Sequence, residues 1–384
     1  MSSSEIGLIG FGSSRYDRQP AMSEFAYMWE AACAALDSAN LSKDVVDGLA
    51  ISSTTLRGDN AVTASEHLGL SLRWAGGSVA GGAGSLACVA DAIAAVEGGR
   101  ADYVLCIAGG RQDRNFFRNR VGAFNDAVSL LLAPHGIGGM NGLFGMIQRK
   151  HADSYGTRRE QLGRIAIGQR ASASRNENAL LRQDMTIDDY LNAPVIADPL
   201  GLYDCVMPCS GAEAVLVGPL ESVPKERRVR VLASGERYNH PRNEPVPVRG
   251  GWELLRDALY DKAGWGPEDV QFAQCYDDYP IMVAIQLEDL GFCAKGEIGQ
   301  FLQDRDMHFD GSFPVNTGGG QLSCGQCGGG GGMIGLVEAV RQLRHEAVGR
   351  QVPHARRGIV SGYGMVGYGH GLAASAMFLE AGNA

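Results

Sequence analysis

Residues 316–335 (NTGGGQLSCGQCGGGGGMIG) combine reactive side chains with a glycine-rich backbone. Cys324 and Cys327 have the CxxC spacing that occurs in zinc sites. A zinc ribbon needs a second cysteine pair, and the other close pair, Cys205 and Cys209, has the wrong spacing. We therefore expect no metal site, and both cysteines should fill small-residue positions in a tight turn.

The glycines of this segment could in principle cradle a phosphate. A P-loop requires G-x-x-x-x-G-K-[ST], which does not occur in the chain. The dinucleotide fingerprint is met only in part by Gly7, Gly10 and Gly12, and the residues SSR follow where a helix should begin. Because glycine costs ~1 kcal/mol relative to alanine inside a helix, this backbone must turn sharply or approach another part closely.

Bulk composition excludes several classes of protein. The chain has 384 residues, of which 45% are hydrophobic and 20% charged, as in an ordinary globular protein. A net charge of −9 without a basic block argues against a nucleic-acid partner. No run reaches the ~18 apolar residues of a membrane span, and residues 1–12 lack the basic start of a signal peptide. Nine scattered cysteines suit free thiols, so we expect a cytoplasmic protein.

Hydrophobic periodicity divides the chain into two similar halves around an arginine-rich, mostly helical insertion at about 111–195. Strands are expected at 5–10, 45–52, 103–108, 212–217, 229–232, 270–276, 358–364 and 373–379. Helices are expected at 24–38, 85–97, 144–155, 159–176, 252–263, 281–290 and 333–343. Each half has a glycine-rich loop that enters a helix, which predicts a layered α/β fold with internal duplication.

Several motifs, in order along the chain, resemble the thiolase superfamily and in particular its sterol-carrier-protein-type branch. They are NTxGGxLS at 316–323, EAVRQLR at 338–344, ADP…YDC…GAEA within 197–214, and LEDLGFC…KGE within 287–297. The resemblance covers the whole chain. It implies the thiolase fold, with α/β/α halves of five strands each at 1–220 and 221–384 and a loop domain at about 111–195. It also implies an acyl-CoA ligand and a homodimer formed through the first half.

The catalytic positions of thiolases are replaced in this sequence. By this resemblance the acyl-accepting cysteine maps to Gly82. Cys88 would lie ~9 Å further along a helix and is better explained as a buried structural thiol. The activating histidine maps to Gln326, and the Asn-Glu-Ala-Phe motif reads Tyr276-Asp277-Asp278-Tyr279. Covalent acyl transfer through cysteine is therefore not expected.

The second thiolase cysteine maps to a tyrosine near the C-terminus. Counting from the strand at 358–361 gives Tyr363, and counting back from the chain end gives Tyr368. These departures resemble the thiolase-fold aldolases that cleave β-hydroxy CoA thioesters of steroid side chains. That resemblance implies retro-aldol cleavage, which needs a base for the β-hydroxyl and a stabiliser for the thioester enolate.

The candidate residues follow from this resemblance. Expected catalytic groups are Tyr276, Tyr363, Tyr368, Asp277 as a proton relay, Gln326 as an enolate donor, and His370 as an alternative base. Expected substrate-binding positions are Gly82, which would leave room for a bulky β-carbon, and Asn316, Gly319, Gly325 and Gly364. No metal and no cofactor beyond the CoA of the substrate are expected. A small OB-fold partner with a zinc ribbon is implied as well.

Two other functions stay open at this point. One is a condensing or acyl-transferring thiolase relative with a different nucleophile, and the other is a non-catalytic acyl-CoA or lipid binder. A lysine-based aldolase is disfavoured because Lys295, the one lysine in a family motif, is expected at a surface turn. Asp277 and Asp278 could instead cap a helix. The acyl chain, the direction of the reaction and the identity of the basic tyrosine are not determined by the sequence.

Overall fold

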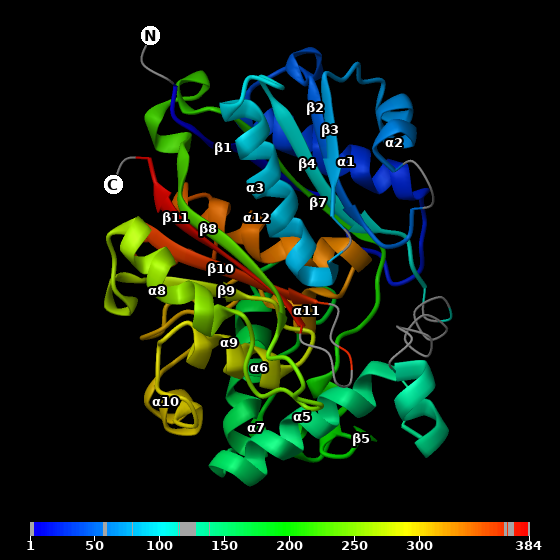
Figure 1. Cartoon of the computed structure of the whole chain (residues 1–384), viewed down its shortest axis with the longest axis vertical. Helices are drawn as coiled ribbons and strands as arrows, with labels where there is room; N and C mark the ends of the chain where they lie inside the picture. Colours follow the sequence, from blue (N-terminus) through cyan, green and yellow to red (C-terminus); the bar gives the residue numbers. More distant parts are fainter. Residues whose placement is uncertain are drawn as a thin grey trace.

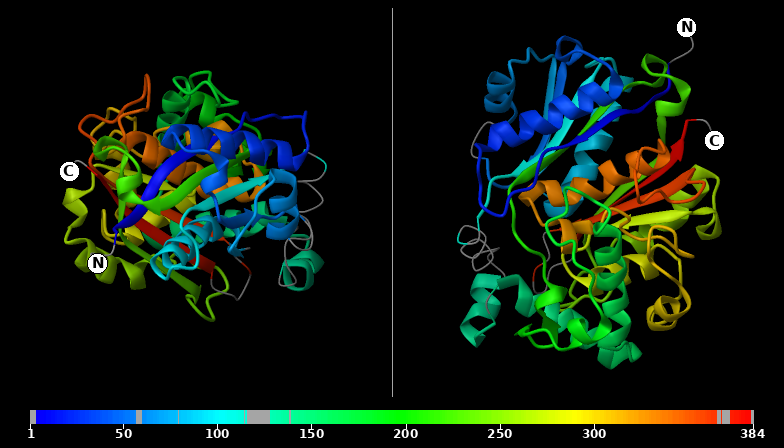
Figure 2. Two further views of the ribbon diagram at one scale, coloured as in Figure 1. Left: turned by 90° about the horizontal axis from the view of Figure 1, so that it is seen from above. Right: turned by 180° about the vertical axis from the view of Figure 1, so that it is seen from behind.

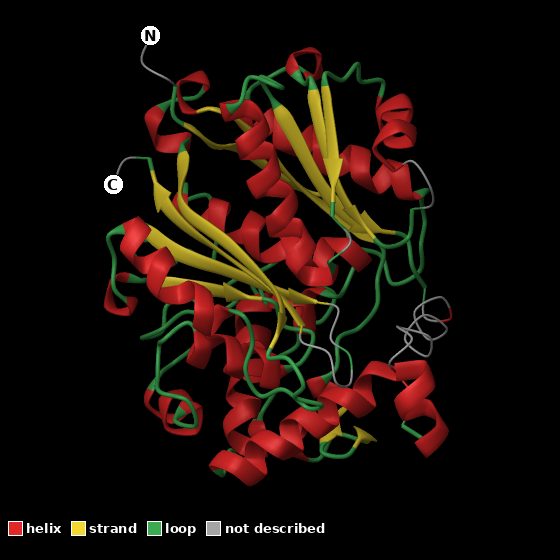
Figure 3. Cartoon of the chain, in the orientation of Figure 1, coloured by secondary structure: helices red, strands yellow, loops and turns green. Residues whose placement is uncertain are grey.

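The computed structural model describes residues 4–56, 60–78, 80–113, 115, 128–137, 139–364, 367 and 372–382. In this part of the chain, nine strands form a sheet in the order β3-β2-β4-β7-β1-β8-β11-β10-β9. Their bounds are β1 (Ile6–Ser13), β2 (Gly48–Ser53), β3 (Trp74–Gly77), β4 (Val104–Gly110), β7 (Gly211–Pro219), β8 (Val229–His240), β9 (Phe272–Cys275), β10 (Arg357–Gly364) and β11 (Leu372–Ala381). β1 and β8 pair only at Gly7 with Arg230 and at Leu8 with Val229. The strands therefore separate into two blocks (Figure 3).

The two blocks confirm the predicted duplicated α/β architecture. The first contains five strands, β3-β2-β4-β7-β1, and the second contains four described strands, β8-β11-β10-β9. Beside β9, where a fifth strand would lie, the chain forms a single parallel bridge between Ala273 and Val315. The expectation of five strands in each half is therefore not met among the described residues. The predicted boundary after residue 220 falls in the connection between β7 and β8 and stays a prediction.

Two helices, α3 (Gly84–Glu97) and α12 (Gly331–Leu343), lie between the blocks of strands (Figure 1). Apolar side chains of both helices share one core with residues from both blocks. A Cβ added at Gly332 would lie 2.5 Å from the Gly82 carbonyl oxygen, and one at Gly335 would lie 3.1 Å from Gln274 Cβ. The glycine run thus lets α12 approach the turn Gly81–Ala83 and β9 closely.

The outer faces of the blocks are covered by amphipathic helices. α1 (Glu24–Ala39) and α2 (Asn60–Leu68) pack on the first block, and α8 (Trp252–Ala263) and α9 (Pro280–Asp289) pack on the second (Figure 1). Ser23 caps α1 by accepting from the Ala26 amide, and Asn40 ends it in the left-handed region. α9 is buried along its whole length. Its side chains are mostly apolar all round the helix because the loop domain covers the side that does not face the sheet.

The loop domain comprises α5 (Gly139–Tyr155), α6 (Arg159–Ala173), α7 (Ile187–Leu191) and the hairpin of β5 (Val195–Ala197) and β6 (Leu200–Gly201). It lies at one end of the molecule, beside the second block (Figures 1 and 2). The remaining short helices are α10 (Ile298–Asp304) and α11 (Gly320–Cys324). Among the described residues, no single helix is long and apolar enough to cross a membrane. One bent pair, 128–135 with 139–155, meets that test by length and composition alone.

An ionic cluster ties α9 to the chain around it. Lys295 Nζ lies 2.6 Å from Asp289 and 3.0 Å from Glu288, and it donates to the Val248 oxygen (3.0 Å). Glu288 also lies 3.1 Å from His151 Nε2 of α5, and both side chains are fully buried. Burial lowers the pKa of Lys295, but the two carboxylates outweigh it and the net pKa is raised. Lys295 lies in a turn, as predicted, but its half-buried amine is paired with two carboxylates, and a protonated, paired amine cannot form a Schiff base readily.

Candidate active site

Tyr276 is the first residue after β9, and hydrogen bonds fix its backbone on both sides. Its amide donates to the Ser361 oxygen of β10 (3.0 Å), which continues the parallel pairing of the two strands. Its carbonyl accepts from Gln286 Nε2 of α9 (2.7 Å). The side chain is only 9% exposed. The ring therefore projects from a rigid frame into the space between the halves of the protein.

Gly82 is the direct neighbour of this ring. A Cβ added at residue 82 would overlap three ring carbons of Tyr276. The φ angle of Gly82 is not positive, so space rather than backbone strain excludes a side chain here. The expectation that Gly82 leaves room for substrate is thereby corrected, because Tyr276 fills the position. Gly364 is similarly close to the 80–82 backbone, where its Cβ would overlap the Ala80 oxygen.

Tyr363, on β10, completes a pair of aromatic rings. Its ring packs edge-on against Tyr276, with centroids 4.9 Å apart and an interplanar angle of 76°. Phe144 of the loop domain (5.9 Å) and Trp252 of α8 (6.3 Å) pack against its other sides. The Tyr363 hydroxyl donates to Asp278 Oδ1. The structure therefore brings together two of the predicted tyrosines and one carboxylate that the prediction left out.

The side chain of Gln326 contacts the hydroxyl group of Tyr276. Its Nε2 donates to Tyr276 Oη (3.3 Å), while its backbone amide donates to the Met207 oxygen (2.8 Å). Since Gln326 donates to Tyr276 Oη, the phenolic hydrogen of Tyr276 is left for another acceptor. Burial raises the pKa of Tyr276 well above its ordinary value, and the charge of Asp278 raises it further. Tyr276 is thus suited to donate a hydrogen bond rather than to act as a phenolate.

Asp277 is engaged elsewhere. Its carboxylate accepts from the backbone amides of Gln321 (2.9 Å) and Leu322 (3.2 Å), at the start of α11. Burial raises the pKa of Asp277 to about 7, against the lowering effect of these hydrogen bonds. This geometry fits the helix-capping alternative, and it does not fit the predicted role of Asp277 as a proton relay for a tyrosine. Asp277 therefore joins the segment after β9 to the glycine loop.

The neighbouring carboxylate, Asp278, was missed as a catalytic candidate. It is partly buried, and its carboxylate accepts hydrogen bonds from the Tyr363 hydroxyl and from its own backbone amide. Burial raises the pKa of Asp278 well above its ordinary value, and the charge of Asp277 adds to this. The sequence offered one signal for it, namely two adjacent acids flanked by tyrosines. In a strand, neighbouring side chains point to opposite faces, but this segment is a loop, so the sequence does not tell which of the two acids faces a tyrosine.

Three of the predicted substrate-binding residues shape the loop. Asn316 has φ 51°, and its Oδ1 accepts from the Cys275 amide (2.7 Å). Gly319 (φ 104°) lies against Ala173, and Gly325 (φ 109°) lies against Cys209 Sγ, 2.6 Å and 2.8 Å from an added Cβ. The φ angles of the two glycines need glycine, whereas asparagine tolerates the left-handed conformation at residue 316. The two glycines face protein rather than the tyrosine pair, so their predicted contact with substrate is not supported.

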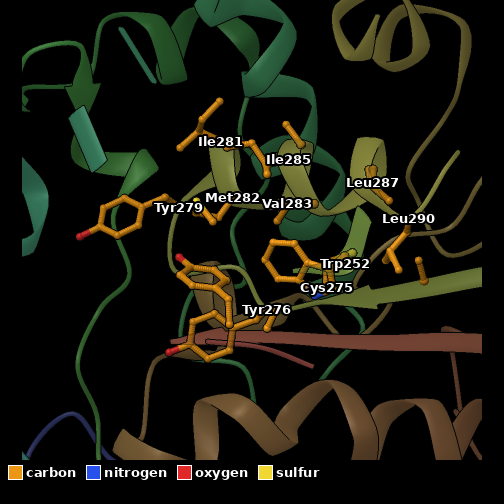
Figure 4. Close-up of a cluster of buried hydrophobic side chains, with 14 of the residues drawn as sticks. Trp252, Cys275, Tyr276, Tyr279, Ile281, Met282, Val283, Ile285, Leu287 and Leu290 are labelled. Atoms are coloured by element: carbon orange, nitrogen blue, oxygen red, sulfur yellow. The ribbon is translucent and has the colours of Figure 1, made fainter. Parts of the chain in front are cut away.

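The other candidates lie apart from the pair or outside the described residues. Tyr368 and His370 belong to the part that the structure does not describe. Tyr279 stacks on Phe144 (4.2 Å), and its hydroxyl donates to Asn141 Oδ1 (2.6 Å). In Figure 4 its hydroxyl points away from Tyr276. Tyr279 therefore holds the loop domain on α9.

The cysteines do not form a nucleophilic centre at this site. All nine are free, and Cys88 is buried in α3 with its thiol directed at the Ile51 oxygen (3.6 Å). Burial raises the pKa of Cys88 to about 12, so its thiolate is disfavoured. Cys324 and Cys327 are buried as well. Within the described ranges, no three His, Cys, Asp or Glu side chains gather in an arrangement that could hold a metal ion.

Comparison with known proteins agrees with this geometry. Residues 255–374 match the family described as Thiolase C-terminal domain-like. The chain is 31% identical to the 17-hydroxy-3-oxo-4-pregnene-20-carboxyl-CoA lyase of Mycobacterium tuberculosis, over 91% of this chain and 94% of that protein. It is 30% identical to the steroid side-chain-cleaving aldolase of Thermomonospora curvata, over 89% and 90% of the two chains. The solved structure titled Ltp2-ChsH2(DUF35) aldolase matches with a TM-score of 0.83 and 27% identity, over 98% of each chain.

Proposed function

The chain belongs to the thiolase superfamily, in the branch of the thiolase-fold steroid side-chain aldolases, and we propose that Tyr276 and Tyr363 form its catalytic centre. The protein is a C–C lyase that acts on acyl-CoA thioesters. It cleaves a β-hydroxyacyl-CoA of the steroid-side-chain kind to a ketone or aldehyde and a shorter acyl-CoA. The reaction uses no cysteine nucleophile.

One observation carries the assignment of the centre: the ring of Tyr276 occupies the space beside residue 82, where thiolases carry their nucleophilic cysteine. A covalent acyl-enzyme at that position would need both a thiol and room for the acyl group. Neither is available, so a thioester bound here meets phenolic hydroxyls instead. This favours bond cleavage by proton transfer over acyl transfer.

The hydrogen bonds of the two tyrosines assign a different role in the reaction to each of them. Retro-aldol cleavage moves the electron pair of the breaking C–C bond onto the thioester, and the enolate oxygen gains negative charge. Tyr276, whose phenolic hydrogen is free of Gln326, donates to that oxygen. Gln326 therefore acts through Tyr276 and not on the enolate directly. Tyr363 is left to face the β-hydroxyl.

We propose a tertiary β-hydroxyl as the reacting group. The M. tuberculosis relative is named for a 17-hydroxy steroid bearing a carboxyl-CoA side chain, in which the hydroxyl carbon carries no hydrogen. Cleavage of such a substrate releases a ketone. No oxidant and no bound cofactor are required, because the hydroxyl proton is returned to the α-carbon of the released acyl-CoA.

We further propose that the chain works with a DUF35 partner, the small OB-fold protein with a zinc ribbon implied by the resemblance. The two-component title of the similar solved aldolase supports this. A homodimer through the first half is proposed from the family resemblance. Co-expression followed by size-exclusion chromatography with light scattering tests both, since it gives the mass and composition of the assembly.

Product analysis by mass spectrometry tests the function. The protein, alone and with the partner, is given 17-hydroxy-3-oxo-4-pregnene-20-carboxyl-CoA, with and without free CoA. We expect a steroid ketone and a shorter acyl-CoA without added CoA. Cleavage that requires free CoA would instead reveal acyl transfer and a nucleophile.

The Tyr276→Phe and Tyr363→Phe variants then test the centre. Each should lower kcat about 100-fold or more, the contribution typical of a positioned acid or base. Tyr260→Phe is the matched control, because the Tyr260 hydroxyl donates to the Leu290 oxygen (3.1 Å), outside the site. Wild-type rates in both site variants would refute the proposed centre.

A further inference from the structure

Asp278 differs from every other carboxylate near the tyrosine pair in what it contacts. Its Oδ1 accepts the hydroxyl hydrogen of Tyr363, a ring that is 2% exposed and clamped by Phe144 and Trp252. Tyr363 cannot turn its hydroxyl away without breaking this packing. The packing therefore fixes the phenol oxygen beside a carboxylate acceptor, and a phenol that donates its hydrogen can still accept a hydrogen bond from a ligand.

The adjacent Asp277 provides the contrast. Both of its oxygens are occupied by amides of α11, so it holds backbone and has no tyrosine partner among the described residues. Within the described part of the chain, Asp278 accepts from no backbone amide of another residue, and it is less buried than Asp277. One acid of the pair thus fixes the loop, and the other is held against a phenol.

We propose that Asp278 is a positioning residue for the lyase reaction, accepting through Tyr363 the proton that leaves the substrate's β-hydroxyl. The proton of the β-hydroxyl passes to Tyr363 Oη as the Tyr363 proton passes to Asp278 Oδ1. The C–O bond becomes a carbonyl, the Cα–Cβ bond breaks, and its electron pair forms the enolate. The same proton then returns through Tyr363 to the α-carbon, so atoms and charge balance. This inference rests on the proposed function.

The surroundings of Asp278 favour proton uptake. Among the described residues, the titratable groups that act on it are Asp277, Tyr276 and Tyr279 of its own segment, Tyr363 of β10 and the thiol of Cys205, between β6 and β7. None of these is a cation. A carboxylate in an apolar, anion-flanked site is a stronger base than one in water. The active form is the ionised one, so activity should fall as pH is lowered through the raised pKa of Asp278.

Steady-state kinetics of Asp278→Asn provides the test, with the substrate and assay given above. Asparagine still accepts the Tyr363 hydrogen bond but cannot take its proton. We expect kcat to fall about 100-fold or more with KM changed less than about threefold, and the acid limb of the pH–kcat profile to disappear. The double variant Asp278→Asn/Tyr363→Phe should be no slower than the slower single variant. A kcat close to that of wild type with the acid limb unchanged would overturn the proposal.

Two further variants keep the test decisive. Asp277→Asn should lower thermal stability, because that acid fixes backbone, yet it should keep an acid limb, shifted to lower pH because the charge of Asp277 raises the pKa of Asp278. If Asp278→Asn fails to fold by circular dichroism, Tyr363→Phe serves instead. Its remaining activity should lack the acid limb, and a wild-type limb there would overturn the relay. Failure of the wild type to cleave the substrate would count against the proposed function itself, which separates the two ideas.

Discussion

At residue 82 the chain differs from a thiolase by more than one side chain. The backbone there accepts any residue, but the Tyr276 ring occupies the space that a Cβ needs. A cysteine at position 82 and the tyrosine ring at position 276 therefore exclude each other. Placing a cysteine at position 82 while Tyr276 remains should not give acyl transfer.

The Gly82→Cys variant tests this link. We expect loss of lyase activity by about 100-fold or more, a lower Tm because the core is overpacked by about 1–3 kcal/mol, and no acyl group trapped on the introduced thiol. Activity and intact-mass measurements after incubation with acyl-CoA check these outcomes. Gly235→Ala is the control, since its added methyl meets only leucine methyls, 3.2 Å away. A stable acyl adduct in Gly82→Cys would contradict the tight packing.

At the scale of elements, α9 is held by charge as well as by apolar packing. Lys295 neutralises Glu288 and Asp289, two carboxylates with no exposure of their own. Lys295→Met should therefore cost about 3 kcal/mol of unfolding free energy, because it leaves buried negative charge unpaired. Urea unfolding at neutral pH measures it. The exposed Lys262 on α8 gives the control, Lys262→Met. Equal stability of both variants would show that water reaches the cluster.

At the scale of the whole molecule, a buried acid faces the junction of the halves. Glu213 of β7 accepts from Tyr16 and from Ser13 Oγ (2.7 Å), and it lies near Arg341 and Glu338 of α12. It lines a partly open pocket of about 70 Å³ that also reaches Tyr276 and Asn316. Burial raises the pKa of Glu213 from 4.5 to about 7. Its ionisation therefore weakens the folded state.

The sign of this effect is testable. Because the folded pKa is raised, the stability that Glu213 contributes is present below about pH 4.5 and lost as pH rises through about 7. The loss amounts to roughly 3 kcal/mol, since each pKa unit corresponds to ~1.4 kcal/mol. Glu213→Gln should therefore lose less unfolding free energy than wild type between about pH 5 and pH 8, as measured by urea titration. Exposed Glu226→Gln is the control. A drop as large as that of wild type would refute the assignment.

The sequence by itself determined the architecture and the family. Apolar periodicity located most strands and helices of both halves, though not α2 or β3, because a buried face imposes its repeat on the residues that form it. The glycine-rich segment 316–335 predicted a sharp turn or a close approach, and α12 makes such an approach to Gly82 and β9. The loss of cysteine and histidine at ordered motif positions indicated a lyase rather than a thiolase.

Only the tertiary structure decided how the site is built. The Tyr276 ring fills the place of the missing thiol, Asp278 rather than Asp277 contacts Tyr363, and the Lys295 amine is paired with two buried carboxylates. Each of these facts depends on contacts between side chains from distant segments or from loops without a repeat. Periodicity reports which face of an element is buried, but it carries no information on which distant side chain meets that face.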